Sequence, residues 1–209
     1  MSYIAAHPMR VALLGATHAE LVALALALAL VFAFPLGLCA ARRPRLSPWL
    51  LGSLGAIYTI PSLALLAVLV QWIGLGFLPV FVALVLYAQF MLARSVAAGI
   101  AGVDPAQVDA ARGLGMSAAQ VLWRVEVRQA LPVMLGGVRV AAVATIAIAT
   151  LGGYVGGVGL GVLIFNGLTL HQPGMIVAGS ATVSVLALAA DGMLRAVERA
   201  LTLERRGER

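Results

Sequence analysis

The longest polar stretch of this sequence, residues 104–132, holds the side chains best suited to bind a partner and reads DPAQVDAARGLGMSAAQVLWRVEVRQALP. Asp104 and Pro105 predict the start of a helix, with aspartate as the N-cap and proline at the first helical position. Ser117, with Gln120 three residues later, predicts a capping box at the start of a second helix, and the glycines between them predict a break. We therefore expect a helix–glycine turn–helix segment that faces water and needs a partner.

The sequence shows no pattern that is typical of an enzyme active site. His7, His18 and His171 are scattered along the chain and lack the spacing of metal ligands. Cys39 is the single cysteine, so an intrachain disulfide is impossible. The phosphate-binding motif G-x-x-x-x-G-K-[ST] does not occur in the sequence. We expect no metal, no cofactor and no ATPase activity from this chain.

The composition indicates a protein whose solvent is lipid. The chain has 209 residues, of which 62% are hydrophobic and only 11% are charged, and a soluble domain of this length cannot bury so much apolar surface. The net charge of +6 comes entirely from arginine. These arginines lie at the ends of apolar segments rather than among aromatic residues, so they indicate membrane topology and not nucleic-acid binding.

Three uncharged runs, residues 21–41, 46–93 and 140–190, set the number of membrane spans. A spanning helix needs about 20 apolar residues, so the second and third runs must each contain two spans. The first run is too long for a signal peptide, and arginines follow it as in a stop-transfer signal. We expect five helices, over residues 18–41, 50–73, 77–98, 134–156 and 174–195.

The arginines also predict the orientation of these spans. With five spans, all of them fall on one side of the membrane except Arg10, and the positive-inside rule makes that side cytoplasmic. The sequence thus predicts an extracytoplasmic segment (1–17), a transmembrane domain (18–195) with a cytoplasmic loop (99–133), and a cytoplasmic tail (196–209). The N-terminus is expected outside and the C-terminus inside.

The cytoplasmic loop resembles the "EAA…G" loop of ABC importer permeases, because Asp109-Ala110-Ala111 is followed after three residues by Gly115. In that family the loop forms a short coupling helix that sits in a groove of the ATPase subunit. Two positions depart from the family pattern: Asp109 replaces the usual glutamate, and Arg128 replaces a proline. The resemblance assigns the contact with the ATPase to Asp104, Pro105, Asp109, Ala110, Ala111, Arg112, Gly113 and Gly115.

Further segments between about residues 20 and 195 resemble the osmoprotectant branch of these permeases, whose substrates are glycine betaine, choline, carnitine and related compounds. They are TIPSLALL (59–66), GVDP (102–105), AARGLGM (110–116), GGVR (136–139), GGVGLG (156–161) and IFNG (164–167).

This resemblance implies an all-α membrane protein, the transmembrane domain of a type I ABC importer with about five transmembrane helices and a cytoplasmic coupling helix. It also implies three protein partners: an ABC ATPase subunit, an extracytoplasmic substrate-binding protein, and a second permease copy or paralogue that completes a dimer. The expected location is the inner or plasma membrane of the cell.

Two alternative functions stay open at this point. The nearer is an importer permease for methionine or another small amino acid. The more remote is a membrane scaffold or a membrane-embedded enzyme, but such an enzyme should place several acidic or histidine side chains together within its spans.

Aromatic residues within the predicted spans are candidates for contact with a cationic substrate. Tyr58, Tyr87 and Tyr154 could guide a quaternary ammonium group through cation–π attraction, and ordinary packing is the other interpretation of each. Near the end of the fifth span, Asp191 and Arg195 are four residues apart and are expected to form an ion pair.

Overall fold

The computed structural model describes residues 2–207, and these are almost entirely helical, with no strand among them. The expectation of an all-α membrane protein is therefore confirmed. The α-helices are α1 (Ser2–Ala6), α2 (Pro8–Arg42), α3 (Ser47–Thr59), α4 (Ser62–Ile73), α5 (Phe77–Ala101), α6 (Pro105–Gly113), α7 (Ala118–Val121), α8 (Val127–Ala149), α9 (Gly161–Thr169) and α10 (Pro173–Gly207). A π-helical turn, Leu122–Glu126, joins α7 to α8, and a 3-10 turn, Thr150–Val155, follows α8.

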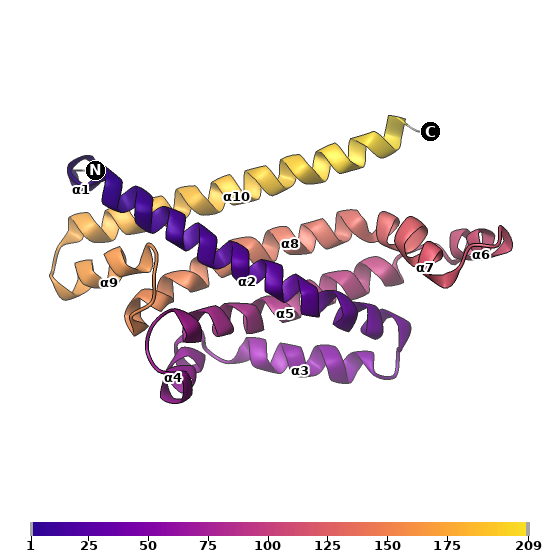
Figure 1. Cartoon of the computed structure of the whole chain (residues 1–209), viewed down its shortest axis with the longest axis horizontal. Helices are drawn as coiled ribbons and strands as arrows, with labels where there is room; N and C mark the ends of the chain where they lie inside the picture. Colours follow the sequence, from indigo (N-terminus) through magenta and orange to yellow (C-terminus); the bar gives the residue numbers. More distant parts are fainter. Residues whose placement is uncertain (1, 208–209) are drawn as a thin grey trace.

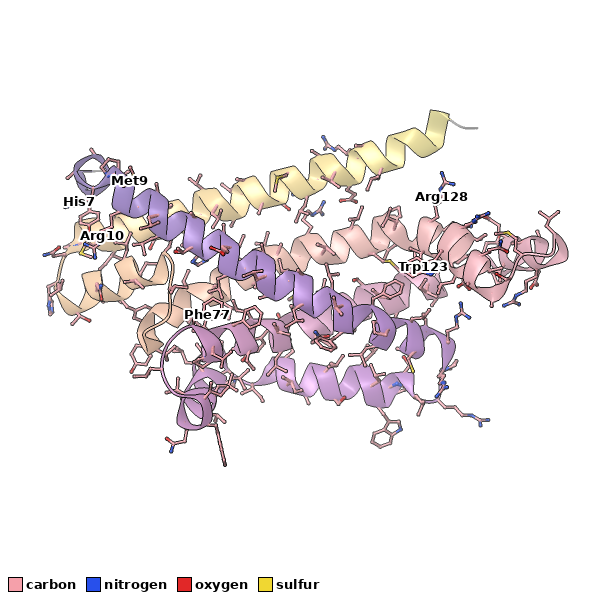
Figure 2. The ribbon with its side chains drawn as sticks, in the orientation of Figure 1. His7, Met9, Arg10, Phe77, Trp123 and Arg128 are labelled. Atoms are coloured by element: carbon pink, nitrogen blue, oxygen red, sulfur yellow. The ribbon has the colours of Figure 1, made fainter. Side chains whose placement is uncertain are left out.

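Within the described residues, four helices are long and apolar enough to cross a membrane, or five spans are present if the bent pair α3 and α4 counts as one. The four are α2, α5, the continuous helix Ala118–Val155, and α10. They run along the long axis of the molecule, with α6 and α7 at one end and α1 and α9 at the other (Figure 1). Figure 2 places His7, Met9 and Arg10 at the α9 end, and Trp123 and Arg128 toward the α6 end.

The predicted second span, 50–73, is wrong as a single straight helix. It breaks between Thr59 and Ser62, and the two halves meet at 90°. Pro61 lacks an N–H and disfavours helical geometry in the residue before it, and Ile60 is accordingly extended, with φ −62° and ψ 129°. The hydroxyl of Tyr87 donates a hydrogen bond of 2.6 Å to the carbonyl of Ile60, which satisfies one backbone group that the break exposes.

The predicted fourth span starts too late. Its helix does not begin near residue 134 but runs without interruption from Ala118 to Val155. The polar second helix of the cytoplasmic loop and the fourth span are therefore a single rod. The first and fifth spans are likewise longer than predicted, because α2 begins at Pro8 and α10 continues to Gly207.

Small residues allow the long helices to approach one another closely, as is common between membrane helices. A Cβ atom on Gly37 of α2 would lie 2.5 Å from the carbonyl oxygen of Ala93 in α5. One on Gly137 of α8 would lie 2.2 Å from the side chain of Ser95 in α5. These contacts make α2, α5 and α8 the compact part of the bundle, from which the loop containing α6 projects (Figure 1).

Candidate functional site

The loop helix α6 begins as the sequence predicts. Asp104 is its N-cap, and its Oδ1 accepts a hydrogen bond of 2.9 Å from the backbone N–H of Ala106, with Pro105 at the first helical position. Asp109 and Arg112 are exposed and lie 3.5 Å apart, a surface ion pair that contributes little to stability. Most of the residues of α6 are likewise exposed to solvent.

The turn after α6 depends on one glycine conformation. Gly115 has φ +81°, a region that disfavours residues with a Cβ. No other atom lies within 4 Å of the position where its Cβ would stand, so the backbone angle and not crowding is the reason for glycine. Gly113 ends α6 without a positive φ and also has open space around it.

The second helix starts with the predicted capping box. The hydroxyl of Ser117 accepts from the N–H of Gln120 at 3.4 Å, and the N–H of Ser117 donates to the side chain of Gln120 at 2.8 Å. This cap fixes where the long rod begins, and therefore where α6 stands relative to it.

A hollow of about 460 Å³ lies between α6 and the start of the long rod. Its lining includes apolar groups from Ala110, Ala111 and Met116, and arginines 124 and 128. The side-chain amides of Gln129 and Gln107 meet at 2.5 Å and link α8 to α6 across it. The apolar floor and basic edge could receive an apolar side chain with an acidic neighbour.

The three candidate tyrosines do not form one site. Tyr58 and Tyr87 pack edge to face, with ring centroids 6.0 Å apart, and Tyr58 also contacts Phe90 at 5.4 Å. Tyr87 is only 4% exposed. Tyr154 lies on the 3-10 turn, is 70% exposed and packs against Phe165.

The histidine buried within the bundle, His18, serves as a link between three segments. The N–H of Leu160 donates to its Nδ1 at 3.3 Å, so its Nε2 carries the proton and donates to the carbonyl of Ile146 at 3.1 Å. Both ring nitrogens thus have partners. In the described residues, no group of three or more His, Cys, Asp or Glu side chains is placed to hold a metal ion.

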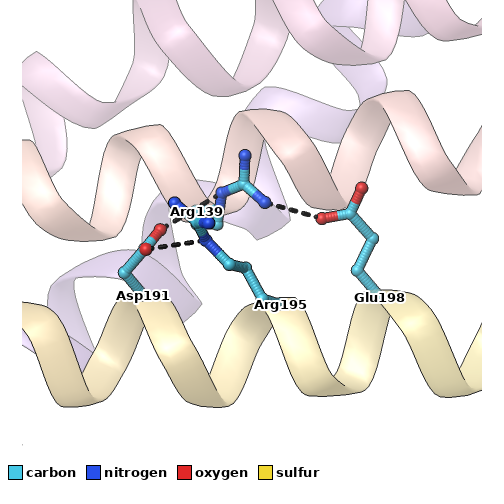
Figure 3. Close-up of polar contacts among 4 residues, drawn as sticks. All are labelled: Arg139, Asp191, Arg195 and Glu198. Atoms are coloured by element: carbon cyan, nitrogen blue, oxygen red, sulfur yellow. Dashed lines mark hydrogen bonds and ion pairs between the residues drawn. The ribbon is translucent and has the colours of Figure 1, made fainter.

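A charged cluster between α8 and α10 was only partly expected. Arg195 and Asp191 form the predicted pair, at 2.8 Å. Arg139 joins it by reaching Asp191 at 3.2 Å and Glu198 at 3.0 Å (Figure 3). Two arginines and two carboxylates make the cluster neutral overall. The position of Arg139 inside the predicted fourth span was the available sequence signal, because charges within spans are rare without partners.

Sequence analysis also missed the contact between the loop and the end of α2. Trp123 stacks on Phe34, with ring centroids 5.3 Å apart, and Glu126 forms an ion pair with Arg42. These partners are more than 80 residues apart in sequence, so no local pattern could reveal them.

Comparison with known proteins agrees with this architecture. The model of the family described as "binding-protein-dependent transport system inner membrane component" matches residues 33–203. The structure is similar to that of the MetNI methionine ABC transporter in an inward-facing conformation, with a TM-score of 0.75 over 91% of this chain and 98% of that chain, at 19% sequence identity. At such low identity the likeness shows the fold alone.

Curated relatives are more similar in sequence. The carnitine transport permease protein OpuCB of Listeria monocytogenes is 38% identical over 85% of this chain and 82% of that protein. The choline transport system permease protein OpuBB of Bacillus subtilis (strain 168) is 36% identical over 88% and 85%. The osmoprotectant import permease protein OsmW of Salmonella typhimurium is 34% identical over 88% of each. This multi-pass membrane chain belongs to the family of inner-membrane components of binding-protein-dependent transport systems.

Proposed function

We propose that this chain is the permease subunit of an ABC importer for osmoprotectants that carry a quaternary ammonium group, such as carnitine, choline and glycine betaine. The observation that carries this proposal is the identity of 34–38% with permeases named for carnitine, choline and osmoprotectants, over 85–88% of this chain. A separate ATPase subunit supplies the energy, and an extracytoplasmic binding protein delivers the solute.

The ATPase subunit docks on α6 and the adjoining turn. The exposure of Asp109, Ala110 and Arg112 supports this role, as does the rigid placement of α6 by its N-cap and by the turn at Gly115. The contact comprises Asp104, Pro105, Asp109, Ala110, Ala111, Arg112, Gly113 and Gly115. The hollow beside α6 adds a place for an apolar side chain of the ATPase, with acidic groups nearby to meet Arg124.

A second copy of this chain, or a paralogue, completes the pathway across a two-fold axis. The α6 end faces the cytoplasm and the α9 end faces the binding protein. Tyr154, with its large exposed area, is the tyrosine best placed to meet a cation entering that end. Such a contact contributes about 0.5–2 kcal/mol. Tyr58 and Tyr87 contribute chiefly by packing at the bend of the second span.

Uptake measurements test the proposed substrates. Cells that lack their own osmoprotectant systems receive the permease together with its ATPase and binding protein, and take up radiolabelled carnitine, choline, glycine betaine or methionine. We expect ATP-dependent uptake of at least one quaternary ammonium compound and none of methionine. Uptake of methionine or another amino acid alone would reject the osmoprotectant assignment. The matched control is the same complex with a hydrolysis-deficient ATPase, which should give no uptake.

A further inference from the structure

The long rod that begins in the cytoplasmic loop contains an irregular turn close to its start. Residues Leu122–Glu126 are π-helical, and the N–H of Val127 donates to the carbonyl of Leu122 instead of that of Trp123. A π turn adds one residue to a helical turn and often marks a functional position. Here it stands between the segment that carries α6 and the helix that crosses the membrane.

The extra residue of the π turn places apolar and charged side chains on different faces of the helix. Leu122 and Val127 both pack against the same apolar cluster, which contains Val96 and Met134. In a regular α-helix, Leu122 would share its face with Glu126, four residues later. The π turn instead brings two apolar side chains to the cluster while Glu126 meets Arg42 at the end of α2.

Two contacts fasten this turn to α2. The ring of Trp123 lies 5.3 Å from that of Phe34 and within 10° of parallel. The Glu126 side chain is 10% exposed and forms an ion pair with Arg42, whose side chain is 42% exposed. A carboxylate with so little solvent depends on its cation far more than a surface carboxylate does. Figure 2 places Trp123 toward the end of the molecule that carries α6.

We propose that the π turn Leu122–Glu126 is the joint through which movement of α6 reaches α2, and that Arg42 and Glu126 are the positioning residues that hold it. This inference rests on the proposed docking of the ATPase at α6. A shift of one residue in helical register at this turn rotates the α6 side by about 100° and moves it about 1.5 Å relative to α8. Because Trp123 and Glu126 belong to the turn, their contacts with Phe34 and Arg42 persist through such a shift only if the end of α2 moves with them.

The test uses the complete complex of permease, ATPase and binding protein in liposomes, with Cys39→Ser as the background. Spin labels at Ala119→Cys and Arg45→Cys report the distance between α7 and the segment after α2. The variants are Arg42→Gln, Glu126→Gln and the exchange Arg42→Glu with Glu126→Arg. The matched control is Arg43→Gln, because Arg43 is the exposed neighbour of Arg42 and forms no ion pair within the residues that the structure describes.

We expect the background protein and Arg43→Gln to show a change of label distance when nucleotide binds. In Arg42→Gln and Glu126→Gln this change should disappear, while uptake per ATP hydrolysed falls about 2- to 30-fold, the range typical of residues that couple distant sites. The charge exchange should recover both signals. Single variants that behave like Arg43→Gln would overturn the inference. So would an exchange variant as impaired as the single ones, because the pairing itself would then be irrelevant.

These measurements distinguish a failure of the proposed joint from a failure of the proposed function. Label distance and ATP hydrolysis need no solute, so an error in the substrate leaves both measurable in the background protein. If the ATPase fails to associate with the background protein through α6, the docking proposal fails first and the joint with it.

Discussion

At the scale of single residues, the geometry of the loop rests on local chemistry that the sequence displays directly. Asp104 caps α6 and Ser117 caps the rod, and in both cases the side chain satisfies a backbone N–H that lies only two or three residues away. Gly115 supplies the turn between them through its positive φ. The position of α6 relative to the rod therefore depends on a few short-range interactions, each of which one substitution removes.

Replacing Gly115 with alanine or leucine should weaken ATPase association, because a Cβ at φ +81° costs about 1–2 kcal/mol. That cost reduces the population of the native turn by about 5- to 30-fold where the turn is not otherwise held. Co-purification of the ATPase in mild detergent and solute uptake both measure the effect. Gly52→Ala is the matched control, since Gly52 of α3 has the same open surroundings without the positive φ and lies outside the docking loop.

The coupling role of the turn would be rejected if Gly115→Leu bound the ATPase and transported solute as well as Gly52→Ala does. Membrane insertion should be normal in both variants, because a Cβ at Gly115 or at Gly52 would meet no other atom within 4 Å.

At the scale of helices, the sequence predicts the features that depend on neighbouring residues and not those that depend on tertiary contacts. Five apolar spans follow from hydropathy and bilayer thickness alone. The 90° break at Pro61 does not, because Pro35 in α2 and Pro132 in α8 also lie within helices that continue past them. What distinguishes Pro61 is tertiary: Tyr87 hydrogen-bonds the carbonyl that the break releases. The Arg42–Glu126 ion pair could not be predicted from the sequence for the same reason, since it joins two segments that are distant along the chain.

The last long helix, α10, is held to α8 partly by charge. The side chains of Arg139, Asp191 and Glu198 are each 23–30% exposed, so their ion pairs are less screened than those on an open surface. This cluster fixes the relative height of the two helices, because Asp191 and Glu198 of α10 each lie at a set distance from Arg139.

Arg139→Gln should therefore lower the stability of the detergent-solubilised protein by about 1–3 kcal/mol, since it leaves the half-buried Glu198 without this cation. Arg195→Gln is the control: its side chain is 53% exposed and its pair with Asp191 lies within one helix, so it should cost only about 0.3–0.5 kcal/mol. Thermal unfolding, monitored by far-UV circular dichroism, compares the loss of stability in the two variants. Equal losses would show that the cluster does not clamp the helices together.

At the scale of the whole molecule, both the charge distribution and the shape distinguish one end of the helical bundle from the other. The loop with α6, the connection after α2 and the C-terminal half of α10 lie toward the same end (Figure 1), and these segments carry most of the arginines. Helix α2 has 35 residues and is roughly 50 Å long, against a hydrocarbon core of about 30 Å. Its first turns, with Arg10 and Glu20, therefore extend to the opposite surface.

This asymmetry predicts that the α6 end is cytoplasmic, and two exposed leucines provide matched probes. Leu114 follows α6 and is 84% exposed, and Leu75 lies in the turn between α4 and α5 and is 74% exposed. Helix α5 separates the two positions by about 37 Å along its axis. In a Cys39→Ser background, a membrane-impermeant maleimide should label Leu75→Cys in intact cells, and Leu114→Cys only after permeabilisation. The positive-inside rule predicts this labelling pattern, because arginines are retained on the cytoplasmic side during insertion. The reverse labelling pattern would invert the proposed orientation, and with it the docking of the ATPase on α6.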